Sequence, residues 1–107
     1  MTWKNTERAI ARRLGGRRTS HRNLGIGAPD VVAGEFSVEV KHRKALPAWL
    51  TDGMAQARHY ATDGQLALLV LHEAGRRHDG DMVVLRLDDF ERWFGEMEAS
   101  DDQEENQ

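Results

Sequence analysis

The sequence contains no cysteine, no long apolar run and no internal repeat. The absence of cysteine excludes disulfide bonds, thiolate metal sites and a cysteine nucleophile. No apolar stretch approaches the roughly 18 residues that a membrane-spanning helix needs. Basic side chains also interrupt the N-terminal stretch where a signal peptide would have its apolar segment. We therefore expect no membrane partner and a cytoplasmic location.

The chain has 107 residues, which suffice for one compact domain but not for two. We expect a single domain over residues 1–98. The remaining residues 99–107 are acidic and contain no apolar residue beyond Ala99. This composition is typical of a disordered tail.

Charge is distributed unevenly along the chain. Residues 1–50 contain ten basic and four acidic side chains, a net charge of +6, whereas residues 51–107 contain five and fourteen, a net charge of −9. Such asymmetry favours a surface that meets a polyanion. A solvated basic helix is an equally good explanation of the same pattern.

The first half of the chain predicts a helix, a loop and a hairpin. Apolar residues at helical spacing favour a helix over residues 2–14, ended by two glycines. Residues 17–28 are rich in arginine and glycine and indicate a basic loop. Residues 29–33 and 35–41 match two strands joined by a turn, and the second of them alternates cleanly.

The second half alternates helix and strand patterns. An apolar face predicts a helix over residues 47–62, with Gly53 inside that face for close packing. The apolar run at residues 65–71 is typical of a strand buried on both faces, and residues 82–87 match another strand. Asp88 is expected to cap a last helix, whose apolar stripe we expect in the core or in a dimer interface. The stripe consists of Phe90, Trp93, Phe94 and Met97.

Acidic residues and a lysine gather in the predicted hairpin. Asp30 begins its first strand, and Glu39 and Lys41 share one face of its second strand, because strand side chains alternate. The hairpin brings Asp30 close to this pair, and two carboxylates suit Mg²⁺ or Mn²⁺. The lysine could position an attacking water or stabilise charge on a phosphate. An ordinary surface Glu–Lys pair remains the alternative.

Two further positions could complete such a site. Glu7 falls inside the apolar stripe of the first helix, where a charge is costly unless it is paired or meets a metal. It could instead reach solvent or pair with an arginine. Gln56 and Tyr60 share a helix face at i, i+4 spacing, although core packing explains Tyr60 equally well.

The order Glu7, Asp30, Glu39-x-Lys41, Gln56-x-x-x-Tyr60 resembles the PD-(D/E)xK nuclease superfamily. The QxxxY helix is similar to that of its RecB-like branch, and the small size and element order are similar to phage and archaeal Holliday junction resolvases. The resemblance covers residues 3 to about 94. The element order predicts an α/β fold with a mixed central β-sheet flanked by helices. The resemblance implies that this is a restriction-endonuclease-like core.

The resemblance implies roles for particular residues. The catalytic residues would be Glu7, Asp30, Glu39, Lys41 and Gln56. Mg²⁺ or Mn²⁺ would be held by Asp30, Glu39, the Val40 carbonyl and, for a second metal, Glu7. Lys41 would serve the attacking water, and Gln56 would orient water or phosphate.

The resemblance also implies a DNA partner, preferably a four-way junction. Other nucleases of the same fold, such as phage recombination or restriction enzymes, and a DNA-binding module that does not cleave are the alternatives. The absence of zinc-finger and helix-turn-helix patterns predicts phosphate contacts without base readout. We expect these contacts from Arg12, Arg13, Arg17, Arg18, Ser20, Arg22, Arg43 and Lys44. Thr19 is the alternative to Ser20, since resolvases often carry a serine in this loop.

A resolvase must nick two strands, so we expect a symmetric homodimer. Its interface would use the stripe of the last helix or exposed parts of residues 65–71. Elsewhere, His78, Asp79 and Asp81 could bind a metal, but a polar hairpin turn explains them better.

Overall fold

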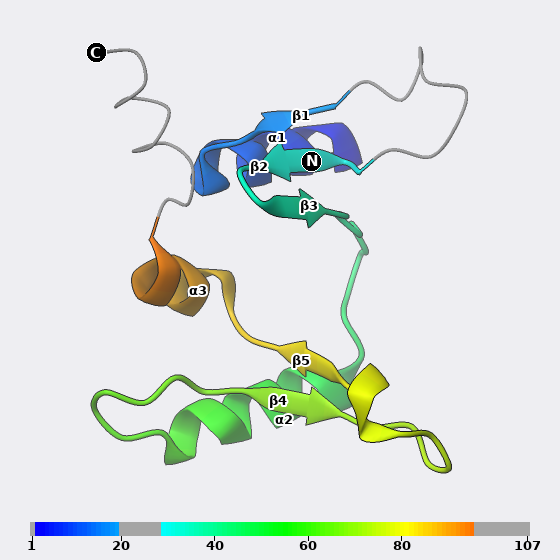
Figure 1. The fold of residues 1–107 in the computed structure, drawn as a ribbon, viewed down its shortest axis with the longest axis vertical. Helices are drawn as coiled ribbons and strands as arrows, with labels where there is room; N and C mark the ends of the chain where they lie inside the picture. The colour runs from blue at the N-terminus through cyan, green and yellow to red at the C-terminus, as the bar shows by residue number, and fades with distance from the viewer. Residues whose placement is uncertain (1, 20–28, 96–107) are drawn as a thin grey trace. The chain divides into compact units, whose positions relative to one another are not determined.

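The computed structural model describes residues 2–19 and 29–95 (Figure 1). It divides the chain into two compact units, each with a small antiparallel sheet of its own. The first unit comprises Met1–Lys44 with Phe94–Gln107, and the second comprises Ala45–Trp93. The predicted acidic tail, residues 99–107, lies outside the described residues.

Helix α1, Trp3–Leu14, forms as its sequence predicts. Thr2 caps its first turn by accepting a hydrogen bond of 3.2 Å from the backbone N–H of Asn5. The helix ends at Gly15, whose φ of 72° is a left-handed conformation that glycine adopts without a steric penalty. The buried face of the helix consists of Glu7, Ala11 and Leu14.

The sheet of the first unit has the order β1-β2-β3, formed by Arg17–Arg18, Val31–Ala33 and Phe36–Val38. Helix α1 packs against β1 and β2 (Figure 1). The chain passes from α1 to β1 through Gly16, where a Cβ would collide with the Val32 carbonyl oxygen. Val31 and Ala33 are fully buried and form the centre of this small core.

The predicted hairpin is confirmed, but the strands are shorter than expected and a third strand joins them. Arg17–Arg18 form β1 and pair antiparallel with β2, in a segment that we expected to be loop from residue 17 onward. A strand of two residues is too short to produce an alternating hydrophobic pattern. It can be recognised only from its pairing with β2 in the structure. The rest of the predicted loop, residues 20–28, lies outside the described residues.

The second unit contains helix α2, Ala48–Tyr60, and strands β4, Leu69–Leu71, and β5, Met82–Val84. A 3₁₀ helix, η1, His78–Gly80, lies between the strands, and helix α3, Leu87–Phe94, follows them. Helix α2 packs against β4, and a Cβ at Gly53 would lie 3.2 Å from Leu69 side-chain atoms. The prediction that Gly53 serves close packing is therefore confirmed.

The prediction that residues 65–71 form a strand buried on both faces is wrong. Only Leu69–Leu71 are extended in a ladder, and Val70 is 54% exposed. Strand β4 pairs with β5, and α2 packs against it at Leu69. The strand therefore has one covered face, and its side chains alternate between half-buried and exposed. A continuous apolar run does not distinguish this arrangement from a strand buried on both faces.

The last helix differs from expectation in its start and its burial. It begins at Leu87, so Asp88 lies in its first turn rather than at the cap. Its predicted stripe is only partly covered: Phe90 is half-buried, whereas Trp93 and Phe94 are about half exposed. Met97 lies outside the described residues.

The α/β class is confirmed in general form, with three helices and five strands in the described residues. In residues 2–19 and 29–95 the strands form two antiparallel sheets rather than one mixed sheet. Hydrophobic patterns identify strands but do not determine which strands pair, which explains this difference. Within those residues, no helix combines the length and apolarity that crossing a membrane requires.

Candidate functional site

Asp30 and Glu39, which the sequence places in one hairpin, lie together in the first unit. The β2–β3 register pairs Val31 with Val38. One further step along this register sets Asp30 opposite Glu39. The backbone N–H of Val40 donates a hydrogen bond of 2.7 Å to Asp30 Oδ2, so this carboxylate contacts the strand end that carries Glu39. Asp30 is buried and Glu39 is exposed, at the end of the hairpin opposite its turn.

Lys41 lies beside Glu39 on the exposed face of the hairpin, as the alternation predicts. Its Nζ is 3.4 Å from Glu39 Oε2, and the side chains are 66% and 57% exposed. An ion pair this exposed contributes about 0–1 kcal/mol to stability. The fold therefore does not require a lysine at this position. The predicted role of the Val40 carbonyl as a ligand stays a prediction, since the contact with Asp30 uses the Val40 N–H.

Glu7 is buried in the first unit, at 3% exposure, and is paired with an arginine. Arg18 Nε donates a hydrogen bond of 2.6 Å to Glu7 Oε1. Arg18 is the register partner of Val31, the residue that follows Asp30. Of the alternatives that the sequence left open for Glu7, the structure therefore has pairing with an arginine.

A contact that sequence analysis missed joins α1 to the segment after β3. Thr6 Oγ1 lies 2.7 Å from His42 Nδ1 in a partly buried hydrogen bond. Thr6 precedes Glu7 and His42 follows Lys41 in the chain. The contact therefore ties the helix that carries Glu7 to the segment that carries Lys41. In the sequence, the only sign of this contact is that Thr6 and His42 each neighbour a predicted site residue.

Basic side chains in the first unit include several of the predicted phosphate contacts. Arg12, Arg13, Arg17, Arg43 and Lys44 are all exposed. Arg18 is half-buried, with its Nε bound to Glu7. Ser20 and Arg22 lie outside the described residues. Thr19, the alternative to Ser20, is buried and donates through its hydroxyl to the Pro29 carbonyl.

An exposed aromatic ring lies among these charges. Lys4 Nζ is 5.4 Å and Arg18 Cζ is 5.8 Å from the centroid of Trp3, distances at which a cation is attracted to the ring face. Trp3 is 51% exposed, so this ring is available to solvent. Exposed aromatic rings between basic side chains are typical of nucleic-acid-binding surfaces.

Gln56 and Tyr60 belong to α2 in the second unit and are both exposed. Tyr60 is therefore not a core residue, and its ring lies edge-on to His59 with the centroids 5.1 Å apart. This pair belongs to the second unit, whereas Asp30 and Glu39 belong to the first.

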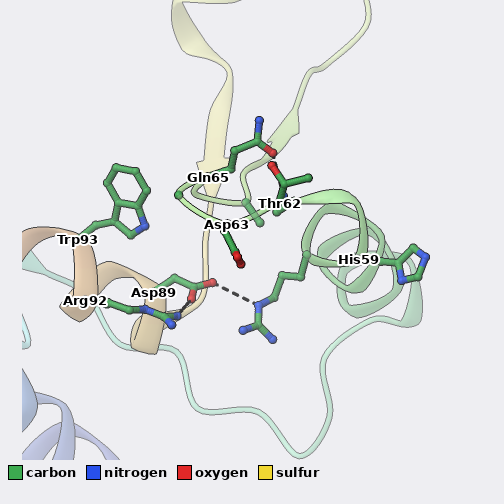
Figure 2. Close-up of a pocket in the computed structure, with 11 residues that line it drawn as sticks. His59, Thr62, Asp63, Gln65, Asp89, Arg92 and Trp93 are labelled. Carbon is green, nitrogen blue, oxygen red and sulfur yellow. Dashed lines mark hydrogen bonds and ion pairs between the residues drawn. The ribbon is translucent and has the colours of Figure 1, made fainter.

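A pocket of about 810 Å³ lies in the second unit, lined by the end of α2, the segment after it and α3 (Figure 2). Asp89 is buried there and accepts hydrogen bonds from Arg58 Nε, at 3.2 Å, and from Arg92 (Figure 2). The two arginines offset the charge of the buried carboxylate, and Arg58 links α2 to α3. The described residues that line this pocket include none of the predicted catalytic residues.

The neighbouring Asp88 is stabilised as a carboxylate. Desolvation acts to raise the pKa of Asp88, but the Arg86 guanidinium and the Asp89 backbone N–H more than offset this and hold that pKa below its ordinary value. Arg58 and Arg92 act in the same direction. Asp88 and Asp89 thus carry the negative charge at the start of α3, where the helix dipole favours it.

Comparison of the chain with models of protein families, with curated proteins and with solved structures gives no match. The candidate site therefore stands on its own geometry. It consists of Asp30, Glu39 and Lys41. The Glu7–Arg18 pair lies in the same unit.

Proposed function

We propose that this chain is a Mg²⁺-dependent endodeoxyribonuclease with a restriction-endonuclease-like core. The observation that carries the proposal is the contact of the Asp30 carboxylate with the strand end that bears Glu39 and Lys41. The buried Glu7, on the helix that packs against β1 and β2, supports the same assignment.

The donor atoms of this site fit a hard divalent cation. Asp30 and Glu39 offer carboxylate oxygens, the ligand type that Mg²⁺ and Mn²⁺ prefer, and Mg²⁺ usually takes only one or two of them. The exposure of Glu39 leaves room for water and for a phosphate of the substrate. Glu7 is paired with Arg18, so its assignment to a second cation requires this ion pair to open.

The reaction is hydrolysis of a phosphodiester. The oxygen of a water molecule bonds to phosphorus, one P–O ester bond breaks, the departing oxygen gains a proton, and the attacking water loses one to solvent. When bound, Mg²⁺ supplies positive charge that offsets the charge developing on the phosphate. Lys41 Nζ donates a hydrogen bond that orients the attacking water or stabilises a phosphate oxygen.

The preferred substrate in this proposal is a four-way DNA junction. A panel of equal-length labelled substrates, comprising a junction, a flap and a linear duplex, tests it in Mg²⁺. Paired nicks on the junction with little cutting of the duplex support a resolvase. Equal cutting of all three leaves a general nuclease of this fold. Tight binding without cleavage in Mg²⁺ or Mn²⁺ contradicts the enzyme and leaves a DNA-binding module.

The DNA-binding module has one observation in its favour. Arg18 already supplies a positive charge to Glu7, in the place where a cation would otherwise do so. Lys41 argues for the enzyme, because phosphate binding alone does not require a lysine paired with a carboxylate, Glu39, that repels DNA. The substrate panel separates the two functions.

Replacing Asp30 by Asn is expected to weaken binding of Mn²⁺ at least about tenfold. The amide can still accept the hydrogen bond from Val40, so the fold is retained while the charge is lost. Calorimetric titration with Mn²⁺ measures the change, and Asp52→Asn, an exposed carboxylate on α2, is the matched control. Equal affinity of Asp30→Asn and the parent would remove Asp30 from the ligand set.

Replacing Arg12 and Arg17 together by Ala is expected to lower the salt dependence of DNA binding. Each lost phosphate contact reduces the slope of log K against log salt concentration by about 0.9. The control is Arg76→Ala with Arg77→Ala, two exposed arginines of the second unit that pair with acids. An unchanged slope in the first variant would show that this part of α1 and β1 faces away from DNA.

The working form is expected to be a symmetric homodimer, because one site per chain supplies one nick and a junction needs two. The half-exposed Trp93 and Phe94 supply apolar surface for an interface. Sedimentation should show a dimer at micromolar concentration, and Trp93→Lys should shift it toward monomer. A parent chain that sediments as a monomer and cuts linear duplex as well as junction would contradict the resolvase assignment.

A further inference from the structure

The hairpin of the second unit brings three potential metal ligands together at the end of its ladder. Strand β4 ends at Leu71 and β5 begins at Met82, which are register partners. The next step along this register sets His72 opposite Asp81. His78, at the start of η1 (yellow in Figure 1), is the third member.

Both histidines are directed at one carboxylate. His72 Nδ1 lies 2.6 Å from Asp81 Oδ1, and His78 Nδ1 lies 3.0 Å from Asp81 Oδ2. The two imidazole rings are tilted by 31° with their centroids 4.3 Å apart. One ligand atom from each residue fits within a span of 4.8 Å.

These separations are close to those of a metal centre. Zn–N and Zn–O bonds of about 2.0–2.2 Å place neighbouring ligand atoms of a tetrahedral site roughly 3.4 Å apart. Small side-chain rotations convert the observed arrangement into that one. Asp81 is 14% exposed and held by both rings, whereas His78 is 82% exposed and can move.

The cluster differs from an ordinary His–Asp hydrogen bond, which needs only one imidazole. Imidazole nitrogens and a carboxylate oxygen are the ligand types that a Zn²⁺ site takes. Imidazole nitrogen also suits Zn²⁺, Co²⁺ and Ni²⁺ and suits Mg²⁺ poorly, so the ligand chemistry here differs from that of Asp30 and Glu39.

We propose that His72, His78 and Asp81 bind a transition-metal dication of the Zn²⁺ class, with a remaining coordination position open to water. This site goes beyond the proposed nuclease function and does not depend on it. The sequence alone suggested a weaker set of His78, Asp79 and Asp81. The structure replaces Asp79, which is exposed and pairs with Arg77, by His72 from across the hairpin.

Co²⁺ tests the site, because its visible absorption changes in position and intensity when protein ligands replace water. Titration of the full chain with Co²⁺ is expected to show one high-affinity site. Zn²⁺ should displace the bound Co²⁺ from it. His72→Ala and His78→Ala should each weaken Co²⁺ binding at least tenfold. Because His78 is 82% exposed, His78→Ala keeps the test valid even where His72→Ala fails to fold.

Two matched control variants test whether the bound metal is held by these three residues. Asp79→Asn changes a carboxylate in the same turn, and His59→Ala removes an exposed imidazole on α2; neither should alter Co²⁺ affinity. Asp30→Asn should also retain the site, which separates it from the carboxylates of the proposed nuclease. A Co²⁺ spectrum that stays that of the aqua ion at millimolar metal, or binding that survives His78→Ala and disappears in Asp30→Asn, would overturn the proposal.

Discussion

Replacing Lys41 by Ala is expected to lower the rate of Mg²⁺-dependent DNA cleavage at least about 100-fold while leaving DNA affinity nearly unchanged. Removal of one preorganised charge that stabilises a transition state has an effect of this size. The folding cost is small, because the side chain is 66% exposed and its ion pair with Glu39 is 3.4 Å long and solvated. Single-turnover cleavage and equilibrium DNA binding measure the two quantities separately.

Lys44→Ala is the matched control for this prediction. Lys44 is also exposed, carries the same charge and lies three positions further along the chain. Lys44→Ala should change DNA affinity by as much as Lys41→Ala does. It should leave the cleavage rate within about a factor of two of the parent, because Lys44 is expected to position phosphate. Cleavage by Lys41→Ala at the parental rate would contradict the catalytic assignment.

Replacing Glu7 by Ala is expected to destabilise the chain by about 3 kcal/mol. The substitution leaves the half-buried Arg18 without its carboxylate partner at 2.6 Å, and removing one member of a buried ion pair is more damaging than removing both. Urea denaturation of the full chain measures the loss in the free energy of unfolding. Glu7→Ala with Arg18→Ala should therefore cost less than the sum of the two single substitutions.

Glu73→Ala provides the comparison for Glu7. Glu73 also pairs with an arginine, Arg76, but both side chains are about three-quarters exposed. Its loss should change stability by less than about 1 kcal/mol. Equal effects of Glu7→Ala and Glu73→Ala would show that burial of the Glu7–Arg18 pair does not contribute to stability.

Patterns that repeat within one element predicted the structure well. The helical stripe that contains Glu7 identified α1. Of the alternatives left open for this glutamate, the structure has a residue that is 3% exposed and paired with an arginine. The alternation around Glu39 identified the face that Glu39 and Lys41 share. In each case the side chains of a single helix or strand carry the information, so no knowledge of the partner is needed.

Features that depend on partners distant in sequence were not predictable. Strand β1 exists only through its pairing with β2, and the burial of β4 depends on which elements cover it. The partner of Glu7 could be named as an arginine but not as Arg18, because several arginines lie nearby in the sequence. His72 was missed for the same reason, since only the β4–β5 register places it beside Asp81.

The central claim is that the Asp30–Glu39–Lys41 site hydrolyses DNA with Mg²⁺. The most direct measurement is the initial rate of nicking of a labelled four-way junction by the purified chain as a function of Mg²⁺ concentration. The account predicts no nicking in chelator, a saturable rise in rate with Mg²⁺, and no rise for Lys41→Ala. A folded, DNA-binding chain that does not nick the junction at any Mg²⁺ or Mn²⁺ concentration, or that nicks it equally in chelator, would contradict it.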